Sequence, residues 1–214
     1  HFIKPLDAFP FKAILWYQGE SDDQETSTYQ AKFTSLVKGF QKQFFAPVIF
    51  CQLPCFEDPA RMVPEGSWAR IRAAQEAASR LPNCSQVVHY DISQATDLHP
   101  EDKWTLGKRV FNHVDAFLGG QDLRGPQLIA VTKDEQNVTL TYDRAVEVIG
   151  DVSNEFRLDS GVALKAMDVD NHFVHLEFAD EIAEGDVLSY QEKAEQDCGL
   201  YANGEPASPF RRVL

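Results

Sequence analysis

The first 120 residues alternate between short apolar runs and longer stretches in which apolar positions recur at helical spacing. The apolar runs at 14–17, 48–53 and 86–91 are typical of buried strands in a sheet covered on both faces. Two amphipathic helices separate them. Their apolar positions are Tyr29, Phe33, Leu36, Val37, Phe40 and Phe44, then Trp68, Ile71, Ala74, Ala78 and Leu81. Ser67 can cap the second helix, a third helix is expected from Pro100, and Gly119-Gly120 ends it. This alternation predicts βαβ units with a parallel sheet.

The pattern changes after Gly120, where the apolar segments have strand length and turn-forming residues separate them. These segments are 128–132, 137–142, 162–167, 172–178 and 187–191. We therefore expect an α/β domain over residues 1–120. We expect a small antiparallel β domain, a sandwich or open barrel, over 121–214. Residues 1–11 are expected to form an irregular lead-in, because Pro5 and Pro10 oppose regular structure.

Composition limits the possible partners. The chain has 214 residues, 43% of them hydrophobic, which suffices for one or two cores, and its net charge is −13. This charge argues against binding to nucleic acid or to anionic membrane surfaces. No apolar run approaches the length of a membrane span. The four cysteines form no zinc pattern, so we expect no metal and no cofactor, and Cys51 and Cys55 lie too far apart along an extended segment to form a disulfide.

Polar residues follow two of the expected strands. Gln18-Gly19-Glu20-Ser21-Asp22 comes directly after the first strand, and Asp97-Leu98-His99-Pro100 lies in the loop after the third. Open α/β sheets gather catalytic groups at the carboxyl ends of their strands. An Asp can orient a nearby imidazole, which leaves the other ring nitrogen free to act as a general base. We therefore expect Gln18, Glu20, Asp97 and His99 to converge on one edge of the sheet.

Five blocks, in order along the chain, resemble the sialate O-acetylesterases. Trp16-Tyr17-Gln18-Gly19-Glu20-Ser21-Asp22 is similar to the family block WYQGES[ND], and Asp97-Leu98-His99-Pro100 is similar to its DxHP block. The other three are Phe50-Cys51-Gln52-Leu53-Pro54, Trp68-Ala69-Arg70-Ile71-Arg72-Ala73-Ala74-Gln75, and the closing LYAN and PASPFR segments. The family lies in the SGNH (GDSL) hydrolase superfamily and is related to acetylxylan esterases. The resemblance implies an SGNH-type, flavodoxin-like parallel sheet flanked by helices.

The resemblance also implies an activity, the hydrolysis of acetyl esters on sugars by a Ser-His-Asp triad. His99 would be the general base and Asp97 its orienting carboxylate. Gln18 would be the oxyanion-hole amide, Gly19 would allow close approach of the backbone, and Glu20 would order the turn. The partner would be an acetylated sugar or glycan, with acetylated sialic acid and acetylated xylan both open. The setting would be secreted, periplasmic or lysosomal.

One part of the family pattern has no counterpart here. The family nucleophile lies in a GQSN-like block ahead of WYQGE, and this sequence contains neither that block nor a GDS or G-x-S-x-G motif. We therefore expect the serine, with the first strand of the sheet, to lie outside this sequence. The chain would then be a fragment, a processed subunit or a truncated gene product, with the missing N-terminal segment as a possible second chain. Ser21 is a weaker candidate nucleophile, because a helix N-cap role fits it better.

Two other functions remain open at this point. The first is a non-catalytic carbohydrate-binding or interaction module, in which Trp104, Tyr142, Phe173 and Tyr190 would supply stacking faces. The second is a glycosidase that pairs Glu20 with Asp22 or Asp97. The glycosidase leaves the pairing of Asp97 with His99 without a role.

Overall fold

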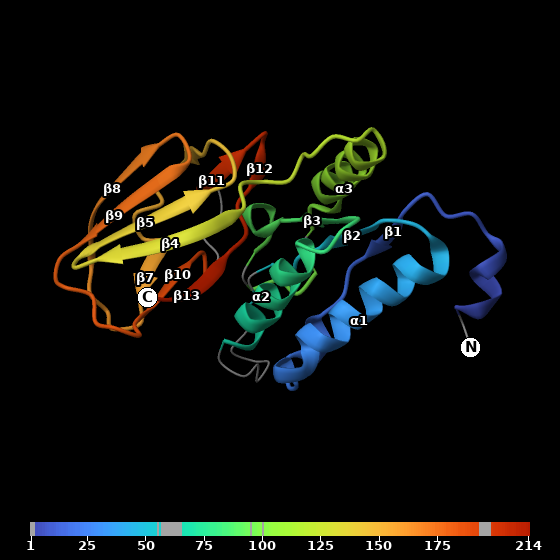
Figure 1. The fold of residues 1–214 in the computed structure, drawn as a ribbon, viewed down its shortest axis with the longest axis horizontal. Coiled ribbons are helices and arrows are strands. Elements are labelled where there is room, and N and C mark those ends of the chain that lie inside the picture. The colour runs from blue at the N-terminus through green and yellow to red at the C-terminus, as the bar shows by residue number, and fades with distance from the viewer. Residues whose placement is uncertain (1–2, 55, 57–65, 95, 100, 193–197) are drawn as a thin grey trace.

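The computed structural model describes residues 3–54, 56, 66–94, 96–99, 101–192 and 198–214, and the chain has a mixed α/β fold (Figure 1). Strands and helices alternate through the first 118 residues, as predicted. The elements are η1 (Lys4–Ala8), β1 (Ile14–Trp16), η2 (Glu20–Asp22), α1 (Thr26–Phe44), β2 (Val48–Cys51), α2 (Ser67–Ser79), β3 (Cys84–Val87), η3 (Tyr90–Ile92) and α3 (Lys103–Leu118), where η denotes a 3₁₀ helix.

The three strands of this part form a parallel sheet in the order β1-β2-β3. Successive residues of a strand point to opposite faces. Val48 and Phe50 of β2 therefore pack against α1 and α2, whereas Ile49 and Cys51 pack against α3. Figure 1 shows the resulting layers, with α3 on one side of the sheet and α1 on the other.

The prediction that both faces of the first strand are buried was wrong. β1 is an edge strand, Leu15 is 59% exposed, and Tyr17 just beyond it is 39% exposed. Trp16 points to the opposite face and packs against Phe40 of α1, with ring centroids 5.9 Å apart. An apolar run shows that side chains on both faces are hydrophobic, but it does not show whether each face has a covering layer.

Proline and glycine account for two differences at the starts of helices. Pro5 lies in the first turn of η1, where a missing N–H breaks no helical hydrogen bond, so the lead-in is not irregular. Gly66, with φ of 66°, precedes α2 as its N-cap, and Ser67 is the first helical residue. Asp102 caps α3 by accepting a hydrogen bond from the Thr105 amide at 2.9 Å. Pro100, the expected start of this helix, lies outside the described residues.

Two strands end earlier than the apolar runs suggested. β2 ends at Cys51 rather than at Leu53, and β3 covers Cys84–Val87 rather than 86–91. The chain turns into η3 directly after β3, so Tyr90 belongs to a helical turn and not to a strand. An apolar run therefore predicted that a strand exists but not where it ends.

Antiparallel strands make up the C-terminal part, as predicted. They form a four-stranded sheet in the order β4-β5-β9-β8 and two three-stranded sheets, β13-β10-β7 and β12-β11-β6. Their bounds are β4 (Leu128–Asp134), β5 (Asn137–Tyr142), β6 (Glu147–Ile149), β7 (Phe156–Leu158), β8 (Leu164–Asp170), β9 (Phe173–Phe178), β10 (Val187–Tyr190), β11 (Gly199–Ala202), β12 (Glu205–Pro206) and β13 (Phe210–Val213). The five expected segments correspond to β4, β5, β8, β9 and β10. The other five strands among the described residues were not predicted, and four of them have two or three residues or contain glycine.

The two parts are joined by buried charged groups. Arg109 of α3 donates two hydrogen bonds to Asp91, at 2.8 and 3.0 Å, and its Nε lies 3.3 Å from the Glu205 carboxylate of β12. The hydroxyl of Tyr201, on β11, donates to Asp91 at 3.1 Å. A second link joins Glu76 of α2 to Arg212 of β13, at 2.9 and 3.0 Å. The division into two domains at residue 120 stays a prediction.

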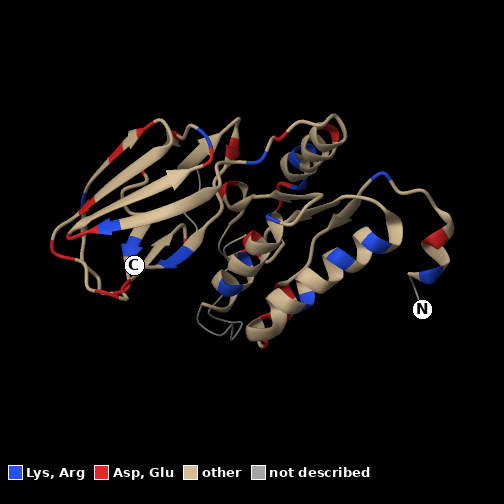
Figure 2. Cartoon of the chain, in the orientation of Figure 1, with Lys and Arg blue, Asp and Glu red and all other residues tan. Residues whose placement is uncertain are grey.

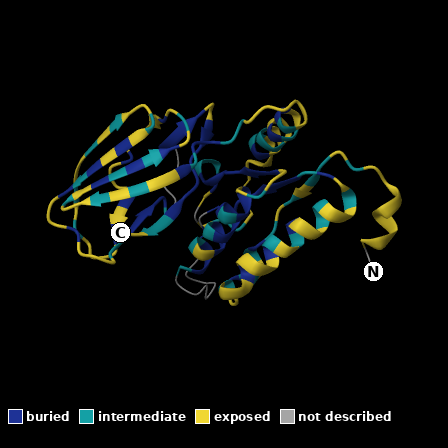
Figure 3. Ribbon diagram, in the orientation of Figure 1, coloured by how far each residue is buried: buried dark blue, intermediate teal, exposed yellow. Residues whose placement is uncertain are grey.

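Charge and burial are distributed over both parts of the molecule. Acidic and basic residues are scattered rather than gathered into one patch (Figure 2). Each part has its own buried interior (Figure 3). Within the described residues, no helix is both long enough and apolar enough to cross a membrane.

We predict that Gly125→Ala destabilises the protein. Gly125 is buried where the connecting segment meets β12, and an added Cβ would clash with the Pro206 carbonyl oxygen. Overpacking of this kind costs about 1–3 kcal/mol, so the midpoint of urea unfolding should fall. Gly39→Ala is the control, because a Cβ on that exposed residue of α1 meets no atom within 4 Å. An unchanged midpoint for Gly125→Ala would contradict the described junction.

Candidate functional site

The polar turn after β1 passes close to the second strand. Gly19 is buried with φ of 144°, a backbone conformation that side chains strongly disfavour. A Cβ at this position would lie 2.9 Å from Leu53 Cδ1 and 3.2 Å from Ile71 Cγ2. Glycine is therefore required twice over, by its conformation and by the space available.

A buried glutamine of α2 holds this turn against the end of β2. Gln75 accepts a hydrogen bond from the Leu53 amide at 2.8 Å and donates to the Gln18 carbonyl oxygen at 3.1 Å. The hydroxyl of Tyr29 also donates to the Gln18 carbonyl, at 3.3 Å. The sequence block around Gln75 was recognised, but nothing in its pattern indicated that this side chain joins the ends of two strands.

The side chains of the turn lie at the edge of the sheet. Gln18 Nε2 donates to Asp22 Oδ2 at 2.6 Å, which fixes the amide and leaves its second N–H free of that bond. Glu20 is half-buried at the start of η2. Ser21 is exposed within η2, and Gly19 takes the N-cap position, so the N-cap role expected for Ser21 was wrong.

The second block forms a tight turn beside the same core. The Oδ1 atom of Asp97 accepts a hydrogen bond from the His99 main-chain amide at 2.8 Å. Leu98, between them, packs against the apolar cluster that contains Leu53. The His99 side chain is exposed. This hydrogen bond orders the loop, and an interaction of Asp97 with the His99 ring stays a prediction.

Both polar blocks come after strands of the parallel sheet, at the end of the sheet where these strands have their carboxyl ends. The segment after β3 also reaches the end of β1, because the His89 ring lies edge-on to the Tyr17 ring with centroids 5.4 Å apart. Lys103 Nζ, at the start of α3, lies 5.7 Å from the centroid of the Tyr17 ring. In the described part of the chain, no hydrogen bond links Gln18 or Glu20 to Asp97 or His99. Convergence of these four side chains therefore stays a prediction.

His89, a residue that sequence analysis missed, lies in the short segment between β3 and η3. His89 is 1% exposed, and its Nδ1 lies 3.0 Å from the Ser93 hydroxyl. The Ser93 hydroxyl also donates to the His89 carbonyl oxygen at 2.7 Å. Burial lowers the pKa of His89 to about 4, so the ring is neutral at pH 7. His89 lay inside an expected strand, and the pattern gave no sign of its position at the edge.

The alternative functions gain little from the geometry. Tyr142 and Tyr190 are buried in the core of the C-terminal part, so neither ring can stack on a sugar. Trp104 and Phe173 are exposed.

Within the described ranges, no group of three His, Cys, Asp or Glu residues could hold a metal ion. Cys51 is a free, buried thiol, and Cys55 lies outside the described residues.

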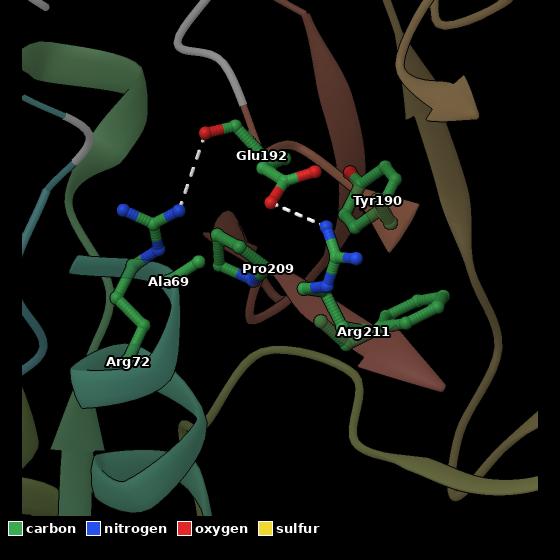
Figure 4. Close-up of a pocket in the computed structure, with 7 residues that line it drawn as sticks. Ala69, Arg72, Tyr190, Glu192, Pro209 and Arg211 are labelled. Carbon is green, nitrogen blue, oxygen red and sulfur yellow. Dashed lines mark hydrogen bonds and ion pairs between the residues drawn. The ribbon is translucent and has the colours of Figure 1, made fainter. Parts of the chain in front are cut away.

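A pocket between α2 and the C-terminal strands is too small for a sugar. Its volume is about 10 Å³, roughly that of a single water site. Glu192 joins the two sides, since its carbonyl oxygen accepts from Arg72 at 3.2 Å and its carboxylate from Arg211 at 2.6 Å (Figure 4). These contacts make the pocket part of the junction between the two halves of the chain.

We predict that Gln75→Leu weakens the fold at this edge. The substitution leaves the buried Leu53 amide without its acceptor, which costs about 1–3 kcal/mol in the free energy of unfolding. Urea denaturation measures this loss. Gln30→Leu, on the exposed side of α1, should change stability by less than about 0.5 kcal/mol. Equal effects of the two substitutions would contradict the role of Gln75.

We also predict a pH dependence that originates at His89. The pKa of His89 falls from 6.5 in the unfolded chain to about 4 in the folded chain. Its contribution to stability is therefore complete above pH 6.5 and is lost as the pH falls towards 4, by on the order of 3 kcal/mol. Urea unfolding at pH 7 and pH 4.5 should show this loss. His89→Gln should reduce the pH dependence, whereas His175→Gln, on an exposed histidine, should retain it.

Comparisons with known proteins identify relatives of this chain. Sialate O-acetylesterase from Mus musculus is 26% identical over 170 residues, which cover 68% of this chain and 31% of that protein. The human enzyme is 26% identical over 172 residues, covering 68% and 32%. The chain thus spans about a third of the length of these curated relatives. A solved carbohydrate acetylesterase from Xanthomonas citri superposes with a TM-score of 0.80 at 24% identity, covering 98% of this chain and 52% of that one, and so shares the fold.

The family model for carbohydrate esterases described as sialic acid-specific acetylesterases matches residues 4–115. This match covers more than half of the chain and includes both polar blocks at the edge of the sheet. The chain therefore belongs to the sialic acid-specific acetylesterase family of carbohydrate esterases.

Proposed function

We propose that this chain is the base-bearing part of a carbohydrate O-acetylesterase that removes acetyl groups from sugars with a Ser-His-Asp triad. The observation that carries the proposal is the family match over residues 4–115, which contains the Gln18-Gly19-Glu20 turn and the Asp97–His99 loop. The parallel pairing of β1, β2 and β3 supports it, because both blocks follow strands that end at one edge.

In the proposed mechanism, His99 takes the proton of the attacking serine hydroxyl while a bond forms between that oxygen and the acetyl carbonyl carbon. His99 then donates the proton to the departing sugar oxygen, which leaves an acetyl-enzyme. In the second half, His99 activates a water molecule that attacks the acetyl carbon. Acetate leaves and the serine recovers its proton. The exposed His99 ring is accessible to such groups.

The other residues orient and stabilise. Asp97 Oδ1 is bound to the His99 main chain, and the proposal assigns Oδ2 to the imidazole, where it stabilises the positively charged ring. The second N–H of Gln18 would stabilise the oxyanion, since the first is held by Asp22. The close fit of Gly19 against Leu53 and Ile71 keeps this amide in position. The Gln75 hydrogen bonds resist movement of the same turn.

We propose that the nucleophilic serine lies on polypeptide outside these 214 residues, either preceding them or as a second chain. The absence of a GDS or G-x-S-x-G motif in the sequence supports this. Ser21 is a poor substitute, because it follows a buried Gly19 and lies on a short exposed 3₁₀ helix rather than on a nucleophile elbow. Acetylated sialic acid and acetylated xylan are the proposed substrate classes. The proposed setting is secreted, periplasmic or lysosomal.

We predict that the chain alone releases acetate from an acetylated sugar or a chromogenic acetate no faster than its His99→Ala variant. A base without a nucleophile can at best activate water. Addition of the nucleophile-bearing segment should restore turnover. His99→Ala should then lower that turnover by several orders of magnitude.

Ser21→Ala is the matched control for this experiment. It should leave the restored activity unchanged, because Ser21 has no role in the proposed chemistry. Robust turnover by the chain alone that disappears in Ser21→Ala would identify Ser21 as the nucleophile and overturn the proposal.

A further inference from the structure

A second cavity lies at the amino ends of the parallel strands, opposite the end that has the two polar blocks. Its volume is about 250 Å³, far more than that of the pocket in Figure 4. Ser79 at the end of α2, Ser85 in the first half of β3 and His113 in the second half of α3 line it. Helix α3 joins the two ends of the sheet, since Lys103 contacts Tyr17 and His113 contacts Ser85. A ligand in this cavity would therefore be separate from the proposed catalytic residues.

Buried polar side chains form part of the cavity wall. Ser85 Oγ lies 2.9 Å from His113 Nδ1, and His113 Nε2 lies 3.4 Å from the Glu205 carboxylate. Both Ser85 and His113 are buried, so their positions are fixed by packing as well as by these contacts. A hydroxyl has one donor and two acceptor sites, so Ser85 can bond to a further group besides His113. Empty cavities in proteins are apolar, whereas a polar cavity is filled by molecules that form hydrogen bonds.

Two arginines line the cavity from different parts of the chain. Arg80 follows α2, and its Nη2 donates to Glu76 at 2.8 Å and to the Leu128 carbonyl oxygen at 3.2 Å. Arg124 lies between α3 and β4, and its Nε and Nη2 donate to Asp122 at 2.9 and 2.8 Å. A guanidinium has more N–H groups than these bonds use, so each arginine keeps donors for a ligand. The planar arrangement of those donors matches a carboxylate.

The charge of the lining residues suits a ligand with one negative charge. Arg80 and Arg124 are positive and Asp122 is negative, which leaves one net positive charge when His113 is neutral. Hydrogen bonds from Arg124 and Arg144 hold the pKa of Asp122 well below its usual range, so Asp122 remains a charged anchor for Arg124. A phosphate, with close to two negative charges at neutral pH, would bring one charge more than the cavity can pair.

The ends of two helices supply acceptors beside these donors. Helix α2 ends at Ser79 and α3 ends at Leu118, next to Phe117 in the cavity wall. The last turn of a helix leaves carbonyl oxygens without partners inside the helix, and this end is electronegative. Hydroxyl groups can donate to such oxygens, whereas an anion also needs the arginines to offset the helix ends. Leu81 and Phe117 add an apolar wall of the kind that covers the ring carbons of a ligand.

We propose that this cavity binds a sugar acid, that is, a monosaccharide with one carboxylate. Arg80 and Arg124 bind the carboxylate, while Ser85 and the helix ends bind hydroxyl groups. Acetate would leave most of the cavity unfilled, and a neutral sugar would leave the arginine donors unused. The sugar-acid site consists of Arg80, Leu81, Ser85, His113, Phe117 and Arg124.

The two parts of this inference have different support. Recognition of a carboxylate rests on the lining residues alone. The choice of a sugar over another hydroxy acid rests on the proposed function, because the substrate of a carbohydrate esterase is a sugar. The site is thus a second sugar-binding site, at the other end of the sheet from the proposed base.

NMR titration of the 214-residue chain with D-glucuronate and with D-glucose measures this binding. The two sugars differ only in that glucuronate has a carboxylate where glucose has a hydroxymethyl group. Glucuronate should bind saturably, shift the amide signals of Ser85 and His113, and bind about tenfold more tightly than glucose, since a hydrogen bond to a charged group contributes about 1.5–3 kcal/mol. Equal binding of the two sugars, binding of acetate as tight as that of glucuronate, or no saturable binding would overturn the proposal.

Matched substitutions test the site itself. Arg80→Met and Arg124→Met should each weaken glucuronate binding by about tenfold, in variants that remain folded by circular dichroism. The two arginines lie on different segments, so loss of the fold in one variant leaves the other as the test, and the amide shifts need no variant. Arg157→Met is the control, because this exposed arginine of β7 donates to the Asn154 carbonyl oxygen and lies outside the sugar-acid site. Unchanged binding in both variants, or equal weakening in the control, would overturn the proposal.

His99→Ala separates this inference from the proposed function. It should bind glucuronate as tightly as the unaltered chain, because His99 lies beyond the other end of the strands. Loss of glucuronate binding in His99→Ala would place the ligand at the proposed catalytic residues and overturn the sugar-acid site. Glucuronate binding without acetate release in the presence of the nucleophile-bearing segment would contradict the proposed function alone. Acetate release without glucuronate binding would contradict the sugar-acid site alone.

Discussion

The geometry at the edge of the sheet depends on one buried side-chain amide. Residues just past the ends of parallel strands have left the ladder, so their main-chain groups need other partners when they are buried. Gln75 supplies both an acceptor for the Leu53 amide and a donor for the Gln18 carbonyl oxygen. This bridge draws the turn after β1 onto β2, so closely that only glycine fits at position 19. The orientation of Gln18 towards Asp22 follows from that contact.

A second constraint fixes η3, the helical turn that leads into the Asp97–His99 loop. Charged groups are costly to bury unless they are paired, and Arg109 is paired with Asp91, the Val88 carbonyl oxygen and Glu205. Asp91 belongs to η3, which leads into the Asp97–His99 loop, and Tyr201 of β11 holds the same carboxylate. The C-terminal strands therefore help to position the loop that carries the proposed base.

The elements of the fold could largely be predicted from the sequence, whereas their surroundings could not. Helical spacing located α1, which has a single buried stripe, and α2, which is buried over most of its surface, and glycine located the end of α3. Short strands such as β6 and β12 were missed because two or three residues carry no periodicity. At the site, motifs led to the prediction of Gln18, Gly19, Glu20, Asp97 and His99. Gln75, His89 and Arg109 were missed as supporting groups, because their roles depend on contacts between residues far apart in the sequence.

The wrong prediction that both faces of β1 are buried also concerns the surroundings of an element rather than the element itself. The apolar run at 14–17 was taken to require cover on both faces, and Trp16 does find cover against α1. Leu15 and Tyr17 are apolar but exposed, and α3, the helix on that face of the sheet, packs on residues of β2 and β3. The apolar run therefore predicted the strand, but whether Leu15 is buried depends on where α3 packs, which the run does not show.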